Sequence, residues 1–292
     1  MKKVLITGAN GFLGQHLCIF LKENGFEVIA TGKGENRLLD PTICYETVEL
    51  TNRNEVEILL KKIQPDVIIH NAALSKPDEC ENNQQLAIDV NVNSTKYLLA
   101  AQKCHFIYLS TDFVFGENGP HSEDENKGPL NFYGESKLQS EQLVLNSMHL
   151  ASVVRPVFMY GKTWEGMKPT FLHWVKNNLE QKKPIKVVSD QWRTPTYVKD
   201  VCKGIQSIIE RESGGIFHLA GKEILSPYDM AIFTAKVLQL DSTLIEKVTA
   251  DTFPEPVKRA KRSGLKIDKA KIELDYNPIS FEEGVRKTFE ME

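Results

Sequence analysis

The sequence predicts an α/β protein with a Rossmann-like, doubly wound and mostly parallel sheet, and a smaller interleaved C-terminal substrate lobe. Three observations predict this fold. Short apolar runs alternate with amphipathic helical patterns over the first half of the chain. A glycine turn at 8–14 follows the first apolar run and opens a helical pattern, the context in which glycine motifs bind phosphate. Beyond Pro156 the regular alternation stops, which indicates a second, smaller unit.

The first predicted strand, 3–7, leads directly into G-A-N-G-F-L-G and then into a helix. Gly8 permits a tight turn, Gly11 lets the backbone approach a pyrophosphate, and Gly14 lets the helix pack closely on the strand. The spacing is G-x-x-G-x-x-G, and a glycine-rich surface turn is the alternative. The residues predicted to bind a dinucleotide here are Gly8, Asn10, Gly11, Phe12, Leu13 and Gly14.

The second strand, 26–31, ends without the carboxylate that usually binds the ribose of NAD. Lys33 and Arg37 follow it and suit a 2′-phosphate, which favours NADP(H). Glu35 lies in the same loop and is able to serve a 2′-hydroxyl, so NAD(H) remains possible. Solvated loop charges are the alternative for both cations.

Further strands are predicted at 45–50 and 67–73, with a helix capped by Thr51 between them. The residues Asn71, Ala72 and Ala73 end the second of these strands, and their small size lets a cofactor lie across the backbone. His70 is interpreted as a satisfied core histidine. The helix predicted at about 81–104 carries Asn91 and Asn93, one of which is expected to brace a neighbouring strand end.

The stretch 110–137 combines S-T-D-F-V-F-G after the strand 105–109 with Y-G-E-S-K at the start of a helix. Tyr133 and Lys137 are four residues apart and therefore share one helix face. A neighbouring ammonium is expected to lower the phenol pKa, so that Tyr133 acts as a proton donor to a carbonyl. Thr111 or Ser110 is placed to hold the carbonyl oxygen. A half-buried ring beside a solvated amine is the alternative.

Beyond the strand 151–156, helices are predicted at 170–181 and 197–211, with strands at 185–189 and 216–219. Three more helical patterns lie around Tyr228, Ala270 and Glu283. The predicted NAD(P)-binding domain spans 1–157, and the segment at about 196–220 returns to it. The substrate lobe takes 158–195 and 221–292, and forms a cleft with the sheet domain.

Composition limits the classes of partner. The net charge is -3, which gives no reason to expect nucleic acid or a membrane surface as partner. No apolar run approaches the length of a transmembrane helix. Five cysteines are scattered without C-x-x-C spacing, which predicts reduced thiols in a cytoplasmic protein and no metal site.

These motifs together resemble the extended short-chain dehydrogenase/reductases, which act largely on nucleotide sugars. Within that group S-T-D-F-V-F-G, P-L-N-F-Y-G-E-S-K, D-Q-W-R-T-P-T, F-H-L-A-G and R-A-K-R-S-G-L resemble the dTDP-4-dehydrorhamnose reductases. The resemblance covers nearly the whole chain. The sequence departs from the group at Phe113, where Tyr is usual, at Arg193, where Gly is usual, and in the stretches 155–161 and 259–263.

The resemblance implies reduction of a 4-keto nucleotide sugar, most like dTDP-4-dehydrorhamnose, by NAD(P)H. Tyr133 would protonate the alkoxide, Thr111 would bind the oxygen, and Lys137 would also hold the nicotinamide ribose. Guanidinium groups suit a diphosphate, although a solvated loop is the alternative for the basic run 258–262. The predicted substrate residues are Ser110, Asp112, Phe113, Arg193, Arg259 and Arg262.

Two other functions remain open. One is a nucleotide-sugar epimerase or dehydratase that retains NAD, and the missing acid after the second strand counts against it. The other is a catalytically silent, cofactor-binding regulatory subunit, since the regulatory subunit of methionine adenosyltransferase resembles the same reductases. The intact Thr111, Tyr133 and Lys137 count against that function. A homodimer is possible.

Overall fold

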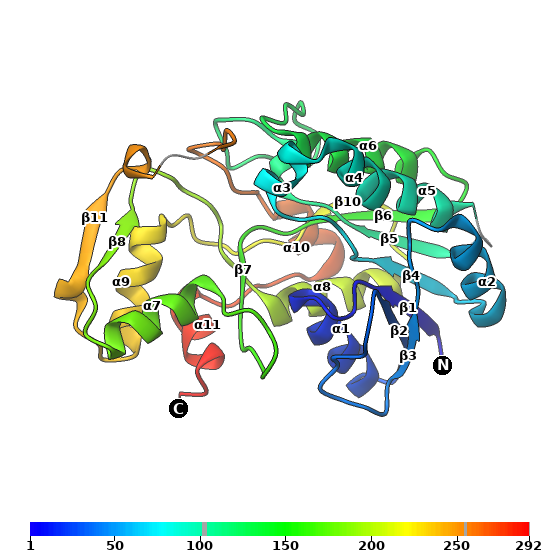
Figure 1. Ribbon diagram of the computed structural model, residues 1–292, viewed down its shortest axis with the longest axis horizontal. Coiled ribbons are helices and arrows are strands. Elements are labelled where there is room, and N and C mark those ends of the chain that lie inside the picture. The colour runs from blue at the N-terminus through cyan, green and yellow to red at the C-terminus, as the bar shows by residue number, and fades with distance from the viewer. Residues whose placement is uncertain (101–103, 254–255, 292) are drawn as a thin grey trace.

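The computed structural model describes residues 1–100, 104–253 and 256–291. Its centre is a sheet of seven parallel strands in the order β10-β6-β5-β4-β1-β2-β3 (Figure 1). The strands are β1 Lys3–Thr7, β2 Glu27–Gly32, β3 Cys44–Thr47, β4 Val67–His70, β5 His105–Leu109, β6 Leu150–Arg155 and β10 Gly215–His218. The predicted doubly wound sheet is confirmed, and the carboxyl ends of its strands form one edge.

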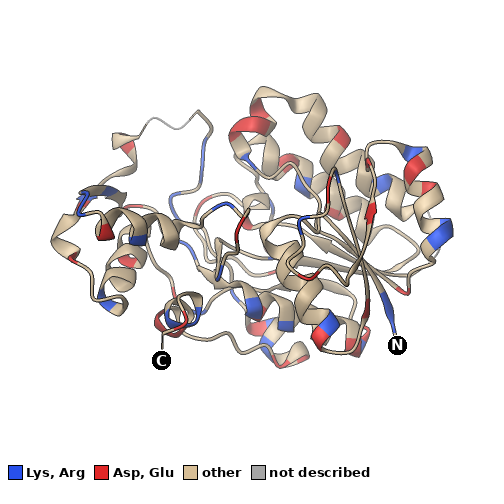
Figure 2. Cartoon of the chain, turned by 60° about the horizontal axis from the view of Figure 1, so that its bottom comes forward, with Lys and Arg blue, Asp and Glu red and all other residues tan. Residues whose placement is uncertain are grey.

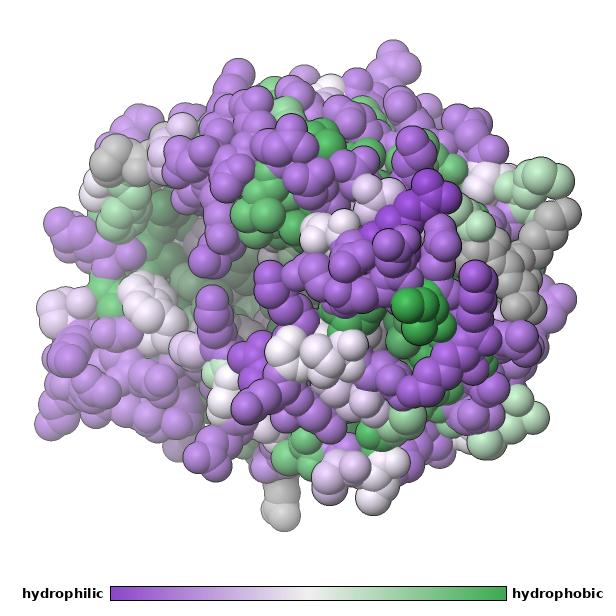
Figure 3. Space-filling model, turned by 45° about the vertical axis from the view of Figure 1, so that its right-hand side comes forward, coloured by the Kyte–Doolittle hydropathy of each residue, from purple (hydrophilic) through white to green (hydrophobic). Residues whose placement is uncertain are grey.

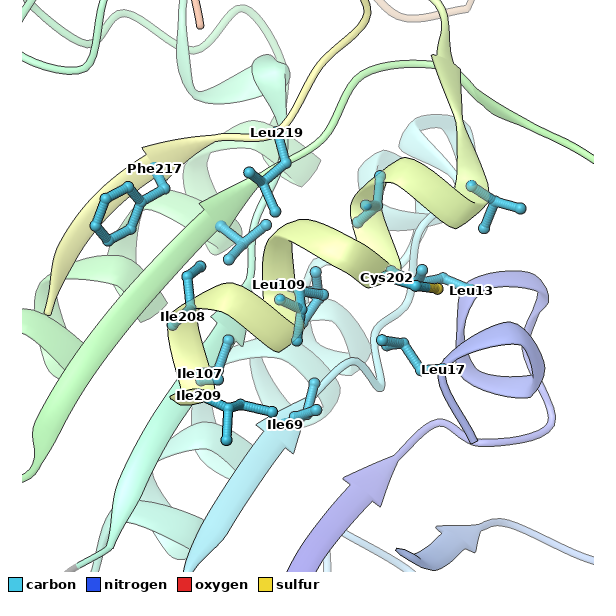
Figure 4. Close-up of a cluster of buried hydrophobic side chains, with 14 of the residues drawn as sticks. Leu13, Leu17, Ile69, Ile107, Leu109, Cys202, Ile208, Ile209, Phe217 and Leu219 are labelled. Atoms are coloured by element: carbon cyan, nitrogen blue, oxygen red, sulfur yellow. The ribbon is translucent and has the colours of Figure 1, made fainter. Parts of the chain in front are cut away.

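Helices cover both faces of the sheet (Figure 1). The helices on one face are α1 Phe12–Glu23, α8 Val198–Arg211 and α10 Asp268–Leu274, and those on the other are α2 Arg53–Ile63, α5 Ser94–Leu99 and α6 Phe132–Leu145. Strand β5 shows why both faces are apolar. Ile107 and Leu109 lie in the core under α8, whereas Phe106 and Tyr108 lie in the opposite core, because successive side chains alternate. Figure 4 shows α8 lying across the strands with Ile208 and Ile209 against Ile107.

The helix predicted at 81–104 is broken into shorter pieces. It consists of α3 Pro77–Asn82, α4 Gln84–Ala87, a π-helical segment Ile88–Asn93 and α5, and its predicted end falls partly outside the described residues. Asn83 restarts the helix because its side chain accepts a hydrogen bond from the Leu86 N–H at 3.1 Å. The predicted cap of α2 is also wrong by one position. Asn52, not Thr51, accepts from the first-turn N–H groups.

The remaining elements form a smaller lobe at the left of Figure 1. They are α7 Phe171–Glu180, β8 Ile185–Val188, α9 Pro227–Val237, β11 Ile245–Val248 and α11 Phe281–Thr288, with β8 and β11 paired in parallel. The short strands β7 Met159–Tyr160 and β9 Thr196–Tyr197 pair where the chain passes between the two parts. Helix α10 belongs by sequence to the predicted lobe segment, yet Ala270 and Leu274 are buried in the sheet core beside α8. The exact domain division therefore stays a prediction.

The surface is mainly hydrophilic on the face shown in Figure 3, and Lys and Arg alternate with Asp and Glu over the helices in Figure 2. Within the described ranges, no helix combines the length and apolar character needed to cross a membrane. All five cysteines are free thiols in the structure.

Candidate active site

A cleft of about 490 Å³ lies at the carboxyl ends of the strands. The predicted site residues that line it are Gly8, Asn10, Gly11, Phe12, Leu13, Lys33, Arg37, Asn71, Ala72, Ala73, Ser110, Tyr133 and Lys137. The residues proposed for the cofactor thus share one cavity with Tyr133 and Lys137, although Lys137 lies 129 positions after Gly8 in the chain.

The glycine turn has little room for side chains. Gly8 has φ +65°, and a Cβ there would lie 2.8 Å from the Cα of Ala72. A Cβ on Gly14 would meet the Gly8 carbonyl and lie 2.8 Å from the Cα of Ala9, so Gly14 serves close helix packing and does not line the cleft. Helix α1 begins at this turn with Gly11 as its N-cap. Its first-turn backbone N–H groups, at the positive end of the helix dipole, lie at the cleft wall.

Asn10 organises the loop after β2. Its amide nitrogen donates to the Glu35 carbonyl at 2.9 Å and to the Tyr45 hydroxyl at 2.8 Å, and its amide oxygen accepts from the Arg37 N–H at 3.0 Å. Lys33 forms an ion pair with Glu49 at 2.9 Å, and this pairing lowers the pKa of Glu49. Two cations and one carboxylate therefore line this end of the cleft.

The end of β4 is held by a buried hydrogen-bond chain. The N–H groups of Asn71 and Ala72 both donate to the Thr7 hydroxyl oxygen at 3.1 Å, so the Thr7 hydroxyl in turn donates to Nδ1 of His70 at 2.8 Å. Nε2 of His70 then donates to the Thr95 hydroxyl at 3.1 Å. Burial lowers the pKa of His70 to about 3, which agrees with a neutral ring and with its interpretation as a core histidine.

Asn91, not Asn93, braces the segment that follows β4. Its side chain accepts from the Leu74 N–H at 2.8 Å and donates to the Leu74 carbonyl at 3.2 Å and to the Ser136 hydroxyl at 2.9 Å. Because Ser136 lies on α6 between Tyr133 and Lys137, the π-helical segment is tied to the helix that carries the proposed proton donor.

Tyr133 and Lys137 lie on the buried face of α6. Burial raises the pKa of Tyr133, and a hydrogen bond with Thr111 offsets part of that rise. We expected Lys137 to lower the pKa of Tyr133, and this expectation is wrong for the protein without bound ligands. Desolvation of the phenol raises its pKa by more than the neighbouring groups lower it. Burial also lowers the pKa of Lys137 to about 7, and its ammonium nitrogen lies 4.2 Å from the centre of the Tyr108 ring.

Ser110 has a different partner from the one expected. Its hydroxyl donates to a carboxylate oxygen of Glu141, which also receives the guanidinium of Arg155. The sequence interpretation overlooked Glu141 and Arg155. The repeat of four from Tyr133 through Lys137 to Glu141 was the signal that would have placed this carboxylate on the same helix face.

A second, small pocket lies between the segments that flank Tyr133 and those of the lobe. The predicted substrate residues Asp112, Phe113, Arg193 and Arg259 line it together with Phe115, Leu130, Asn131, Ala260 and Ser263. Its cavity is about 20 Å³, the size of a single water position. Burial raises the pKa of Asp112, and the Arg193 guanidinium counteracts that rise.

The predicted arginines have different surroundings. Arg193 donates to Gln191 at 2.9 Å, and Arg259 pairs at 3.3 Å with Asp78 on α3. Arg262 is exposed and lies 6.0 Å from the centre of the Trp192 ring, so the structure does not bring it into the pocket.

Neither pocket is a metal centre by composition. Across residues 1–100, 104–253 and 256–291, no group of three or more His, Cys, Asp and Glu side chains is arranged to hold a metal ion.

Comparison with known proteins identifies the family of the chain. It matches the RmlD substrate binding domain over residues 1–292. It is 30% identical to the dTDP-4-dehydrorhamnose reductase of Aggregatibacter actinomycetemcomitans, with 98% of each chain covered. It is 31% identical to methionine adenosyltransferase 2 subunit beta of Pongo abelii, with 93% of this chain and 82% of the relative covered.

The fold agrees with these matches. The crystal structure of dTDP-4-dehydrorhamnose reductase from Bacillus anthracis str. Ames in complex with NADP superposes with a TM-score of 0.84 at 27% identity, and covers 99% of this chain and 98% of that chain. The chain therefore belongs to the RmlD substrate binding domain family, and the predicted resemblance to the dTDP-4-dehydrorhamnose reductase group of extended short-chain dehydrogenase/reductases is confirmed.

Proposed function

We propose that this protein reduces a 4-keto nucleotide sugar with NAD(P)H, and that its substrate is dTDP-4-dehydrorhamnose or a close relative. The observation that supports this most is the shared cleft: the glycine turn at the start of α1 and the pair Tyr133 and Lys137 line one cavity. A hydride donor bound along that turn therefore comes within reach of a proton donor. The reductases among the relatives add the substrate class.

The cleft fits a dinucleotide. Gly8 and Gly11 leave the backbone open at the N-terminus of α1, where amide groups and the helix dipole suit a pyrophosphate. Asn71, Ala72 and Ala73 would lie along the cofactor, and Lys137 would hold the nicotinamide ribose. When bound, the cofactor supplies a hydride to the ketone carbon.

The chain itself supplies the proton and stabilises the developing charge. Tyr133 keeps its proton at neutral pH, because the ordinary phenol pKa of about 10 is raised further by burial, so the phenol is an O–H donor when the alkoxide forms. Thr111 lies two residues beyond the end of β5, within hydrogen-bonding reach of Tyr133, and would donate a second hydrogen bond to the same oxygen. Asp112, Phe113, Arg193 and Arg259 line the adjoining pocket and are proposed to contact the nucleotide sugar.

NADP(H) is the preferred cofactor in this proposal. Lys33 and Arg37 line the end of the cleft beyond the glycine turn, and the loop that carries Arg37 is fixed by Asn10. Two cations there favour a 2′-phosphate. The neighbouring Glu49 is able to accept from a 2′-hydroxyl, which keeps NAD(H) possible.

The test follows NADPH and NADH oxidation by absorbance with dTDP-4-keto-6-deoxy sugar generated in situ. Stoichiometric oxidation of one cofactor is the expected result. Cofactor that stays bound through purification without net consumption would instead indicate an epimerase or dehydratase. Binding of both cofactors without oxidation of either, over a panel of keto-sugars, would contradict the reductase.

A regulatory role is the second candidate, because methionine adenosyltransferase 2 subunit beta is as similar in sequence as the reductase is. The small volume of the pocket around Asp112 and Arg193 is compatible with it. Complex formation with a methionine adenosyltransferase catalytic subunit, measured by size-exclusion chromatography together with absent ketone reduction, would support that role.

A further inference from the structure

Helix α6 carries three polar side chains at a spacing of four: Tyr133, Lys137 and Glu141. All three are buried, with exposed fractions of 8%, 2% and 2%. The spacing places them in one row along the helix. The proposed chemistry uses the first two and leaves a buried carboxylate, one turn beyond Lys137, without a role.

Glu141 joins α6 to the ends of the two neighbouring strands. Arg155, at the end of β6, donates from Nε at 2.8 Å and from Nη2 at 2.6 Å to the two carboxylate oxygens. Ser110, directly after β5, donates its hydroxyl to the first of these oxygens. A bidentate guanidinium pair fixes both distance and orientation. One carboxylate thus sets where α6 lies relative to the strand end that carries Thr111.

Arg155 also has contacts on the side facing away from Glu141. Its Nη1 lies 3.2 Å from Nε2 of His218, at the end of β10, and its guanidinium lies 5.0 Å from the centre of the Phe115 ring. His218 accepts this hydrogen bond as a neutral ring, because burial and the Arg155 charge lower its pKa to about 3. Glu141 is therefore the acidic group that balances Arg155 in this buried cluster.

We propose that Glu141 is a positioning residue that holds α6 on the strand ends and keeps Lys137 in place as a cation beside Tyr133. This role deepens the proposed function, on which its catalytic consequence rests. Lys137 is desolvated, and its ammonium faces the Tyr108 ring, so a negative charge one helical turn away stabilises its protonated form.

The charge environment agrees with this role. Burial lowers the pKa of Lys137, and Glu141 gives the largest opposing influence. The other titratable or charged groups facing Lys137 or Glu141 are Cys80 on α3, His70 on β4, Tyr108 on β5, Lys127 in the loop before α6, Tyr133 on α6 and Arg155 on β6.

The test reads the titration of Lys137 directly, without any substrate. Protein labelled with ¹³C at lysine Cε is titrated by NMR, and the Lys137 signal is assigned with Lys137→Arg. The wild-type midpoint is expected near 7. In Glu141→Gln, loss of the carboxylate should move it to lower pH by about one unit. Glu135→Gln removes an exposed carboxylate from the same helix and should leave it unchanged.

Glu141→Gln alone leaves Arg155 as a buried, unbalanced charge, so a second variant guards against a folding failure. Glu141→Gln/Arg155→Gln removes both charges and should show a smaller acid shift of the midpoint than Glu141→Gln, because the guanidinium that opposes the Lys137 ammonium is lost with the carboxylate. A midpoint at or above the wild-type value in either folded variant would overturn the proposal, whatever happens to stability. Because the NMR titration needs no ketone substrate, it can be interpreted even if the reductase assay shows no activity.

Discussion

At the scale of single residues, the same desolvation acts on the two groups of the proposed proton transfer in opposite senses. It raises the pKa of Tyr133 and lowers the pKa of Lys137 to about 7. Both shifts favour the uncharged form, because burial removes water from the ion. Tyr133 is thus kept as a hydrogen-bond donor, while Lys137 is poised between its charged and neutral forms near physiological pH.

Tyr133→Phe removes the proton donor while keeping the ring that packs on Phe113 at 5.5 Å between centroids. We expect the dissociation constant for NADPH to stay within about twofold, and kcat to fall by a factor on the order of 10² to 10⁴. Fluorescence titration measures the first quantity and single-turnover kinetics the second. Tyr228→Phe, in the lobe helix α9, should change neither. Unchanged turnover in Tyr133→Phe would exclude the assigned role.

At the scale of elements, the sequence predicted the seven sheet strands well, because most of them are short apolar runs between polar turns. The exception is the edge strand β3, which reads C-Y-E-T and has no buried residue. The sequence could not predict the break of the helix after α3. That break depends on a long-range requirement: the π-helical segment turns Asn91 towards Leu74 and Ser136, which lie on other parts of the chain. The glycine turn was predictable because two of its constraints are local: the positive φ of Gly8 and the close approach of Gly14 to Ala9. The contact of Gly8 with Ala72 is long-range, and the glycine spacing alone did not reveal it.

The loop after β2 also explains cofactor choice at this scale. Asn10 of the glycine turn accepts from the Arg37 N–H at 3.0 Å, so the phosphate-binding turn and the loop that carries the cations are one unit. Lys33 is already paired with Glu49, and because the Lys33 side chain is exposed, that ion pair stays sensitive to salt. Arg37 is therefore the cation on which discrimination for the 2′-phosphate should depend most.

Arg37→Ala should weaken NADPH binding by about tenfold, because a charge-assisted hydrogen bond to phosphate is lost, and leave NADH binding within about twofold. Titrations that follow the fluorescence of each reduced cofactor measure both constants at one ionic strength. Arg286→Ala, which removes a partly exposed arginine from α11 outside the cleft, is the control. Equal weakening for NADPH and NADH would show that Arg37 supports the loop and does not read the phosphate.

At the scale of the whole molecule, four histidines on strands and helices lie in the buried interior. The sequence indicates the strand or helix on which each lies, but it does not indicate their hydrogen-bond partners. His70, His105 and His218 end or begin sheet strands, and His16 lies on α1. Each is less than a tenth exposed, and burial lowers each pKa, to about 3 for His70 and His218 and to about 4 for His16 and His105. Their hydrogen bonds connect residues far apart in the chain, which is why sequence spacing did not reveal them.

This interior sets how stability depends on pH. In the unfolded chain a histidine takes up a proton below its ordinary pKa of about 6.5, whereas the folded chain cannot do so until about pH 4 or below. The unfolded state therefore binds more protons in this window, and the free energy of unfolding falls as pH falls. Each of the four histidines should remove about 2 kcal/mol between pH 7 and pH 5, a large share of the total for a typical domain.

Urea unfolding of the wild type and of His70→Gln at pH 7 and pH 5 tests this expectation. The variant should be less stable at pH 7, because a buried hydrogen-bond chain is broken, yet its loss between pH 7 and pH 5 should be about 2 kcal/mol smaller than that of the wild type. Thr95→Val also breaks the hydrogen bond to Nε2 but keeps the histidine, so it should retain the wild-type pH dependence. If His70→Gln and Thr95→Val lose the same free energy over this window, His70 does not carry the proton uptake assigned to it.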